Sequence, residues 1–151
     1  MDKNIRKIAI AADHGGYDLK EDIKTFVIEN LNIEWIDLGT HSTESVDYPE
    51  YGFKMAKAIT DGMADTGIII CGSGIGISIA ANRNADIRAA LCTSPEMAKL
   101  SREHNNANVL ALGARVTPHD VNIECVKAFL TTDFDGGRHA RRVDKLSGGC
   151  Q

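Results

Sequence analysis

Short apolar runs alternate along this chain with longer segments whose apolar residues recur every three or four positions. Five runs have the length of buried strands: residues 8–12, 33–37, 67–71, 87–92 and 108–112. Strands that alternate with helices predict βαβ units, and hence a parallel sheet covered by helices on both faces. We therefore expect an α/β protein with a three-layer α/β/α, Rossmann-like fold and a five-stranded parallel sheet.

The helices are predicted from their apolar faces and from their first residues. Residues 18–31 form one face with Leu19, Ile23, Phe26, Val27 and Leu31, and a second helix has Met55, Ala56, Ile59 and Met63. Ser94-Pro95-Glu96 is typical of a helix start, with a capping hydroxyl, a proline at the first helical position and an acid near the dipole. Thr117-Pro118 repeats this device before the face of Val121, Cys125, Ala128 and Phe129.

Length and charge narrow the classes of protein. The 151 residues suit one domain, 1–151, in which residues 138–151 form a basic C-terminal helix and tail. A net charge of −4 argues against nucleic-acid or acidic-membrane partners. No apolar run approaches the ~18 residues of a membrane-spanning helix, and the first residues lack the features of a signal peptide. We expect a cytoplasmic protein.

The four cysteines have no metal-binding spacing and, in a reducing compartment, no disulfides are expected. Cys92 and Cys125 lie on apolar stretches and are interpreted as small core residues. Cys150 falls in a glycine-rich tail and is treated as incidental. Only Cys71 has a chemical setting, and the spacing of the cysteines does not suggest a zinc site.

Cys71 opens a glycine turn, Cys71-Gly72-Ser73-Gly74-Ile75-Gly76, between a buried strand and a new helix. Glycine lets the backbone approach a ligand closely, and the amides at a helix N-terminus attract an anion. The same field favours a thiolate on Cys71. The turn lacks the Gly-x-Gly-x-x-Gly dinucleotide fingerprint. It therefore predicts a cradle for an anion that also contains a base or nucleophile.

Ligands of such sheets bind beyond the carboxyl ends of the strands. Asp13 and His14 follow the first strand, Cys71 the third and Arg115 the fifth. His104 and Asn105 instead end the fourth helix. This places them at the amino-terminal ends of the strands, on the opposite side of the sheet from Cys71. If all these residues serve one site, that site is shared between subunits.

Each candidate also has a purely structural interpretation. Glycines after a strand can serve close packing alone, and Cys71 can be a small apolar core residue. Asp13 and His14 can cap the first helix, and His104 can be a favourable charge at a helix C-terminus. The arginines Arg115, Arg138, Arg141 and Arg142 can form a solvated basic face. Yet Arg138 and Arg142, four residues apart, make a fork suited to a phosphate.

Seven stretches together resemble one family. They are 12–16 (ADHGG), 39–40 (GT), 47–49 (DYP), 70–83 (ICGSGIGISIAANR), 101–105 (SREHN), 108–115 (NVLALGAR) and 135–142 (DGGRHARR). On these the chain resembles the B-type ribose-5-phosphate isomerases, in the group that includes the galactose-6-phosphate isomerase subunits. The resemblance covers about residues 7–146. One departure is Ser73, where many members have threonine, and the hydroxyl is kept.

The resemblance implies an aldose–ketose isomerase that works through a cis-enediolate without metal or cofactor. Cys71 is then the base, Ser73 relays protons between the two sugar oxygens, and His104 is the acid that opens the furanose ring. The backbone of Gly72, Ser73, Gly74, Ile75 and Gly76 is expected to hold the enediolate oxygen. The resemblance further assigns sugar contacts to Asp13, His14 and Asn105, and phosphate contacts to Arg115, Arg138 and Arg142. His14 can share the ring opening, and the site is assembled in a homo-oligomer.

Three functions stay open on the sequence. The first is a ribose 5-phosphate isomerase, and the second is a hexose-phosphate isomerase that acts on allose 6-phosphate or galactose 6-phosphate. The presence of Cys71, Ser73 and His104 in one chain favours a self-sufficient homo-oligomer over a pair of unlike subunits. The third is a non-catalytic module that binds a sugar phosphate or nucleotide, which needs neither Cys71 nor His104.

Overall fold

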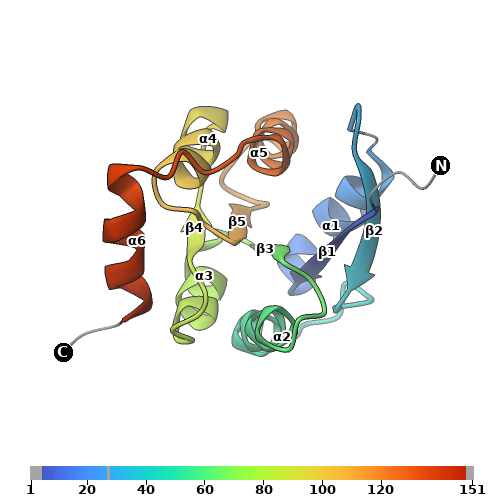
Figure 1. The fold of residues 1–151 in the computed structure, drawn as a ribbon. Helices are drawn as coiled ribbons and strands as arrows, with labels where there is room; N and C mark the ends of the chain where they lie inside the picture. Colours follow the sequence, from blue (N-terminus) through green and yellow to red (C-terminus); the bar gives the residue numbers. More distant parts are fainter. Residues whose placement is uncertain (1–4, 27, 149–151) are drawn as a thin grey trace.

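The computed structural model describes residues 5–26 and 28–148 and contains one parallel β-sheet (Figure 1). Its strands are β1 (Ile5–Ala12), β2 (Asn32–Asp37), β3 (Thr66–Cys71), β4 (Ala89–Leu91) and β5 (Val109–Gly113). The helices are η1 (His14–Gly16), α1 (Tyr17–Thr25), α2 (Tyr48–Thr60), α3 (Ile75–Asn82), α4 (Pro95–Glu103), α5 (His119–Thr131) and α6 (Arg138–Ser147). The predicted α/β fold with five parallel strands is confirmed.

Helices cover both faces of the sheet because its strands are apolar on both sides. Ile8 and Ile10 point into a core shared with α1, α4 and α5, whereas Ala9 and Ala11 point into a second core shared with α2 and α3. Figure 1 shows these two helical layers above and below the sheet. The small β1 alanines and Gly67 leave room for Met55 of α2, since a Cβ on Gly67 would overlap the Met55 side chain.

The strand order β2-β1-β3-β5-β4 determines where a ligand can bind. From β1 the chain continues to β2 on one side, and β3 lies on the other, so the carboxyl ends of β1 and β3 form the topological switch point. There the N–H of Asp13 donates to the carbonyl of Ile70 at 3.1 Å. The residues after β1 and after β3 are therefore held side by side.

Two predicted helices are too long. The first was expected over residues 18–31, but α1 ends at Thr25, whose hydroxyl donates to the carbonyl of Asp22, and Phe26 is extended and 41% exposed. The chain must then reverse into β2, which it does through Asn30 at a φ of +66°. The second helix, α2, ends at Thr60 before Gly62, so Met63 lies outside it and is exposed.

Two further predictions are corrected at the ends of elements. The strand expected at residues 87–92 is only Ala89–Leu91, because the side chain of Asn108 accepts from the N–H of Arg88 where a backbone carbonyl would otherwise pair. Ser94 caps α4 as predicted, by accepting from the N–H of Met97. Thr117 does not cap α5, because Pro118 occupies the N-cap position and Thr117 lies one residue before it.

Some predictions fall outside the described residues. These are the place of Val27 on the first helix, the interpretation of Cys150, the first four residues and the end of the tail at 149–151. The basic C-terminal helix is confirmed as α6, which lies outside the layers at the β4 end of the sheet (Figure 1). Among the described residues no helix is long and apolar enough to cross a membrane.

A buried lysine ties the end of β2 to α1. Lys20 is fully buried and donates to both carboxylate oxygens of Asp37, at 2.8 and 2.6 Å, while Lys24 donates to the second. Burial raises the pKa of Asp37, but hydrogen bonds from the two lysines and the Gly39 N–H outweigh it and bring the value to about 2. Asp37 thereby anchors Gly39, whose carbonyl accepts from the N–H of Ala12 directly before the site.

Candidate active site

The Cys71 thiol lies at the carboxyl end of the central strand and is 5% exposed. The N–H of Gly74 donates to its Sγ at 3.1 Å. A donor aimed at sulfur stabilises the charged form of a thiol more than the neutral form. The first turn of α3 adds further amides that have no carbonyl partner within the helix. The glycine turn therefore directs at least one backbone donor at the Cys71 sulfur.

Gly74 makes this geometry possible. It is the N-cap of α3 at a φ of +79°, and an added Cβ would lie 2.6 Å from Leu91 and 2.8 Å from the backbone carbon of Leu112. No other residue type fits both the backbone angle and the space. The neighbouring Ser73 accepts from the N–H of Ile75 at 3.1 Å, so its own hydroxyl proton is free to point toward a ligand.

Not every amide of the turn is free for a substrate oxygen. The Gly74 amide is occupied by Cys71 and the Ile75 amide by Ser73. From the sequence, the whole backbone of residues 72–76 is expected to hold the enediolate oxygen. The geometry narrows the remaining donors to the amides of Gly72, Ser73 and Gly76.

Asp13, Arg115 and the glycine turn converge around Gly15. A Cβ on Gly15 would lie 3.3 Å from the guanidinium carbon of Arg115, from Oδ1 of Asp13 and from the Gly72 nitrogen. Asp13 is buried, and its Oδ1 accepts from the N–H of Gly16, so the predicted capping role at the start of the first helices is confirmed. Arg115 is exposed, and its own N–H donates to the carbonyl of Gly72.

The tautomer of His14 follows from one hydrogen bond. Its Nδ1 accepts from the backbone N–H of Val46 at 3.1 Å. A backbone amide can only donate, so Nδ1 carries the lone pair and the neutral ring has its proton on Nε2. In this state His14 offers a ligand an N–H donor and not a basic nitrogen.

Asp13, Cys71 and the glycine turn border a cavity of about 460 Å³, which we call the thiol pocket. Its lining residues are Asp13, Tyr48, Cys71, Gly72, Ser73, Ile75, Gly76 and Ile79. Tyr48 and Ile79 were not predicted as site residues. Tyr48 follows Asp47 at the start of α2 and lies against Gly76, where a Cβ would overlap its ring. Its place in the Asp47-Tyr48-Pro49 helix start was the only available signal.

His104 and Asn105 lie at the other end of the sheet, as predicted. His104 is the C-cap of α4, and a loop of four residues separates it from β5. Because Val109 pairs with Gly67 and Gly113 pairs with Cys71, the length of β5 separates the two ends, about 13 Å. Asn105 borders a different cavity, of about 780 Å³, with Arg83, Arg88 and Leu146. One copy of the chain does not bring His104 to Cys71.

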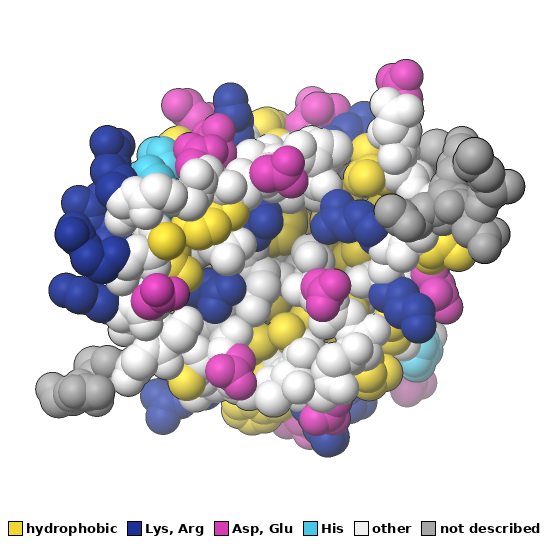
Figure 2. All heavy atoms as spheres, viewed as in Figure 1, with side chains coloured by type: hydrophobic (Ala, Val, Ile, Leu, Met, Phe, Trp, Pro, Cys, Tyr) yellow, Lys and Arg dark blue, Asp and Glu magenta, His cyan; other side chains and the backbone are white. Residues whose placement is uncertain are grey.

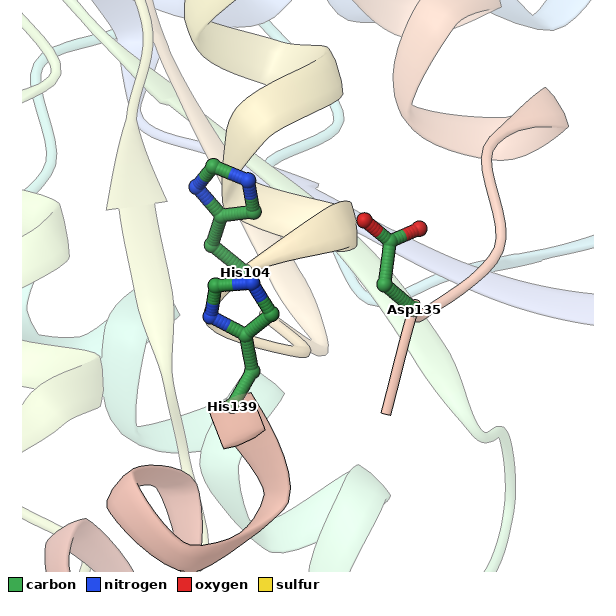
Figure 3. A group of neighbouring side chains, drawn as sticks. All are labelled: His104, Asp135 and His139. Atoms are coloured by element: carbon green, nitrogen blue, oxygen red, sulfur yellow. The ribbon is translucent and has the colours of Figure 1, made fainter. Parts of the chain in front are cut away.

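His104 instead neighbours His139 and Asp135, which we call the histidine cluster (Figure 3). One potential ligand atom from each residue lies within 4.8 Å of the other two, so the set could hold a metal ion. However, the two imidazoles are stacked at 14° to one another, with centroids 4.3 Å apart. Lone pairs of nearly parallel rings do not converge on one point, so at least one ring would have to turn to bind a metal.

The predicted phosphate ligands do not lie together: one is beside the thiol pocket and two are beside the histidine cluster. Arg115 lies by the thiol pocket, whereas Arg138 and Arg142 lie on α6, beside the histidine cluster. Figure 2 shows Lys and Arg side chains gathered over α6. Arg138, Arg141 and Arg142 are exposed, and none has an ion pair among the described residues. This positive surface is free to meet an anion.

The other described cysteines have no such surroundings. Cys92 and Cys125 are buried in the core, and burial raises the pKa of each thiol to about 11. The prediction that they are core residues is confirmed.

The fold and the site together define an α/β protein with a binding site at the topological switch point of its parallel sheet. The site contains a thiol, a carboxylate and free helix amides. Comparison with known protein families identifies the family to which this α/β protein belongs. The Ribose/Galactose Isomerase family matches residues 8–146, and the chain belongs to this family. The resemblance stated from the sequence motifs is thereby confirmed.

Individual proteins that are similar to this chain support the same family. Ribose-5-phosphate isomerase B of Escherichia coli (strain K12) is 46% identical over 143 residues, which cover 95% of each chain. The structure of ribose-5-phosphate isomerase B from Clostridium thermocellum is 52% identical, with a TM-score of 0.88, over 94% of this chain and 95% of that one. The Mycoplasma genitalium enzyme with bound ribulose-5-phosphate is 40% identical, with a TM-score of 0.84, over 97% of both chains.

Proposed function

We propose that the protein interconverts ribose 5-phosphate and ribulose 5-phosphate, with Cys71 as the base and without a metal or organic cofactor. The observation that carries this proposal is the Gly74 amide aimed at the Cys71 sulfur. The thiolate takes the proton from C2 of the open-chain aldose and the electron pair forms a cis-enediolate. The proton then returns to C1, which leaves the ketose. Each step conserves atoms and electrons, so no redox partner is needed.

The remaining pocket residues have roles that suit their hydrogen bonds. Ser73 accepts from Ile75, so its hydroxyl proton can move between O1 and O2 of the enediolate. The amides of Gly72 and Gly76 are donors for the developing negative charge. His14, held by Val46, donates from Nε2 to a sugar hydroxyl, and His104 is the ring-opening acid in this proposal.

His104, Asn105, Arg138 and Arg142 complete the site from a second copy of the chain. Two observations support a shared site. The residues lie at the opposite end of the sheet from Cys71 in their own subunit. In addition, Ile75 and Ile79 of α3 are 53% and 60% exposed at the edge of the thiol pocket, an apolar surface that suits burial against a partner. The proposed assembly is a homo-oligomer, and its cytoplasmic location stays a prediction.

A hexose-phosphate isomerase is the second candidate, because the matching family includes galactose isomerases. The two differ by one carbon in the substrate. Initial rates with equal concentrations of ribose 5-phosphate, allose 6-phosphate and galactose 6-phosphate decide between them. We expect the highest kcat/KM with ribose 5-phosphate. A higher value with a hexose phosphate would transfer the proposal to that sugar, and no turnover of any of the three would favour a binding module.

A further inference from the structure

The histidine cluster contains a residue that the proposed reaction has not used. His139 is the second residue of α6, and its ring is stacked on that of His104 at the end of α4 (Figure 3). The ring centroids are 4.3 Å apart and the ring planes make an angle of 14°, so the two imidazoles are stacked in close contact. The contact joins two elements that are far apart in the sequence.

The backbone around the two rings fixes this contact. The N–H of Asp135 donates to the carbonyl of Glu103 at 3.1 Å, which ties the segment before α6 to the residue preceding His104. The chain then turns through Gly136 and Gly137, at φ of +67° and +55°, and the N–H of His139 donates to Gly136. His104 is held by its own N–H, which donates to Leu100. Both rings are therefore carried on anchored backbone.

The surroundings of His139 disfavour the charged form of its ring. Burial lowers the pKa of His139, and the neighbouring His104, Arg138 and Arg142 lower it further, against an opposing effect of Asp135. Two positive rings would repel each other at the stacking distance. A neutral ring at position 139 avoids that repulsion and can keep its π face against the ring of His104.

We propose that His139 is a positioning residue for the ring-opening acid, because its imidazole stacks on His104 and holds that ring in place to protonate the sugar. The inference rests on the proposed isomerase function. In ring opening the C1–O4 bond breaks, O4 takes the proton of His104, and the O1 hydroxyl gives its proton to water as the carbonyl forms. A misplaced acid slows this step and leaves the later enediolate chemistry of Cys71 unchanged.

The test separates ring opening from proton transfer at carbon. Ribulose 5-phosphate has no furanose form, because the hydroxyl that would close the ring carries the phosphate. Enzyme-catalysed exchange of its C1 proton with deuterium oxide, followed by NMR, therefore reports Cys71 alone. Conversion of ribose 5-phosphate reports both steps. The variants are His139→Ala, His139→Phe and His104→Ala, with exposed His119→Ala as a matched control.

We expect His139→Ala to lower kcat for ribose 5-phosphate by about 10- to 100-fold, in the direction of His104→Ala, and to change C1 exchange less than about threefold. His139→Phe keeps a flat ring and is expected to restore most of the rate, whereas His119→Ala changes neither reaction. If the phenylalanine variant is as slow as the alanine variant, and KM rises in both, His139 binds the phosphate and the inference is wrong. Equal losses in conversion and exchange would also overturn it. Absence of both reactions in the wild type would instead overturn the isomerase proposal.

Discussion

The backbone N–H of Gly74 lies 3.1 Å from the sulfur of Cys71, three residues earlier in the chain. The glycine reaches this position only because its φ of +79° turns the amide back toward the end of β3. One residue therefore starts α3, fills no side-chain space and donates to the thiol. The turn therefore contributes both to the fold and to the chemistry, and substitutions can test these two roles separately.

Replacement of Cys71 by alanine should abolish isomerisation while the fold persists. Loss of a general base lowers kcat by about 10²–10⁴-fold. The measurements are ribose 5-phosphate turnover and the urea midpoint. Cys92→Ala is the control, since that thiol is buried in the core and should affect stability rather than turnover. Near-normal turnover of Cys71→Ala would show that another group is the base.

Gly74→Ala should destabilise the protein far more than Gly62→Ala. Both glycines have a φ of +79°, but a Cβ on Gly62 meets nothing within 4 Å, whereas a Cβ on Gly74 meets Leu91 and Leu112. The backbone angle alone costs about 1–2 kcal/mol, and forced overpacking adds about 1–3 kcal/mol at Gly74. Equilibrium unfolding in urea measures both. Equal losses in the two variants would mean that Leu91 and Leu112 adjust freely.

A shared active site predicts that two inactive variants restore each other. Cys71→Ala and His104→Ala damage different halves of the site, so a mixed dimer has one intact site and one site that lacks both residues. Random reassociation after mild denaturation should return about one quarter of the wild-type activity, since half of the dimers are mixed and half of their sites are intact. No recovery, with mixed oligomers confirmed by native mass spectrometry, would show that the two residues belong to one subunit's site.

Arg138 and Arg142 should act on substrate binding more than on chemistry. Replacing either by alanine removes a charge-assisted contact to the phosphate, so KM for ribose 5-phosphate is expected to rise by about 10-fold or more with little change in kcat. Arg141→Ala is the control on the same helix and should raise KM less. A fall in kcat at constant KM would instead assign these arginines to the transition state.

Asp37 should make stability depend on pH below about 4. Its folded pKa of about 2 lies below the ordinary 3.8, so the ionised carboxylate favours the folded state. This stability is present above the unfolded pKa and is lost as the pH falls from about 4 toward 2. The shift corresponds to about 1–2 kcal/mol after allowance for solvent screening.

Asp37→Asn tests this contribution. The variant leaves the buried ammonium of Lys20 with the half-exposed Glu21 as its remaining carboxylate, at a cost of about 3–5 kcal/mol at pH 7. The difference from the wild type should shrink between pH 4 and pH 2.5, as followed by urea unfolding. Asp61→Asn, which breaks an exposed pair with Lys57, should change the stability little at any pH. A pH-independent difference would mean that Asp37 acts through its hydrogen bonds alone.

Much of the pocket was predictable because its residues are local to strand ends. Cys71 is the last residue of β3, and Asp13 and Arg115 lie within two residues after β1 and β5, so the parallel topology alone brings them to the carboxyl ends of the strands. Tyr48 was missed because α2 starts after a loop whose path no spacing reveals. The hydrogen bond from Val46 to His14 joins residues 32 positions apart and was equally out of reach.

The sequence by itself determined which runs are buried, where the glycine turn lies, and that His104 belongs at the opposite ends of the strands from Cys71. These follow from periodicity and from the two ends of a parallel strand, which are local rules. The tertiary structure decided which amides of the turn remain free, which tautomer His14 adopts and that His139 stacks on His104. Those features depend on contacts of a few ångströms between segments distant in the chain, and such contacts are set by packing, which no local pattern encodes.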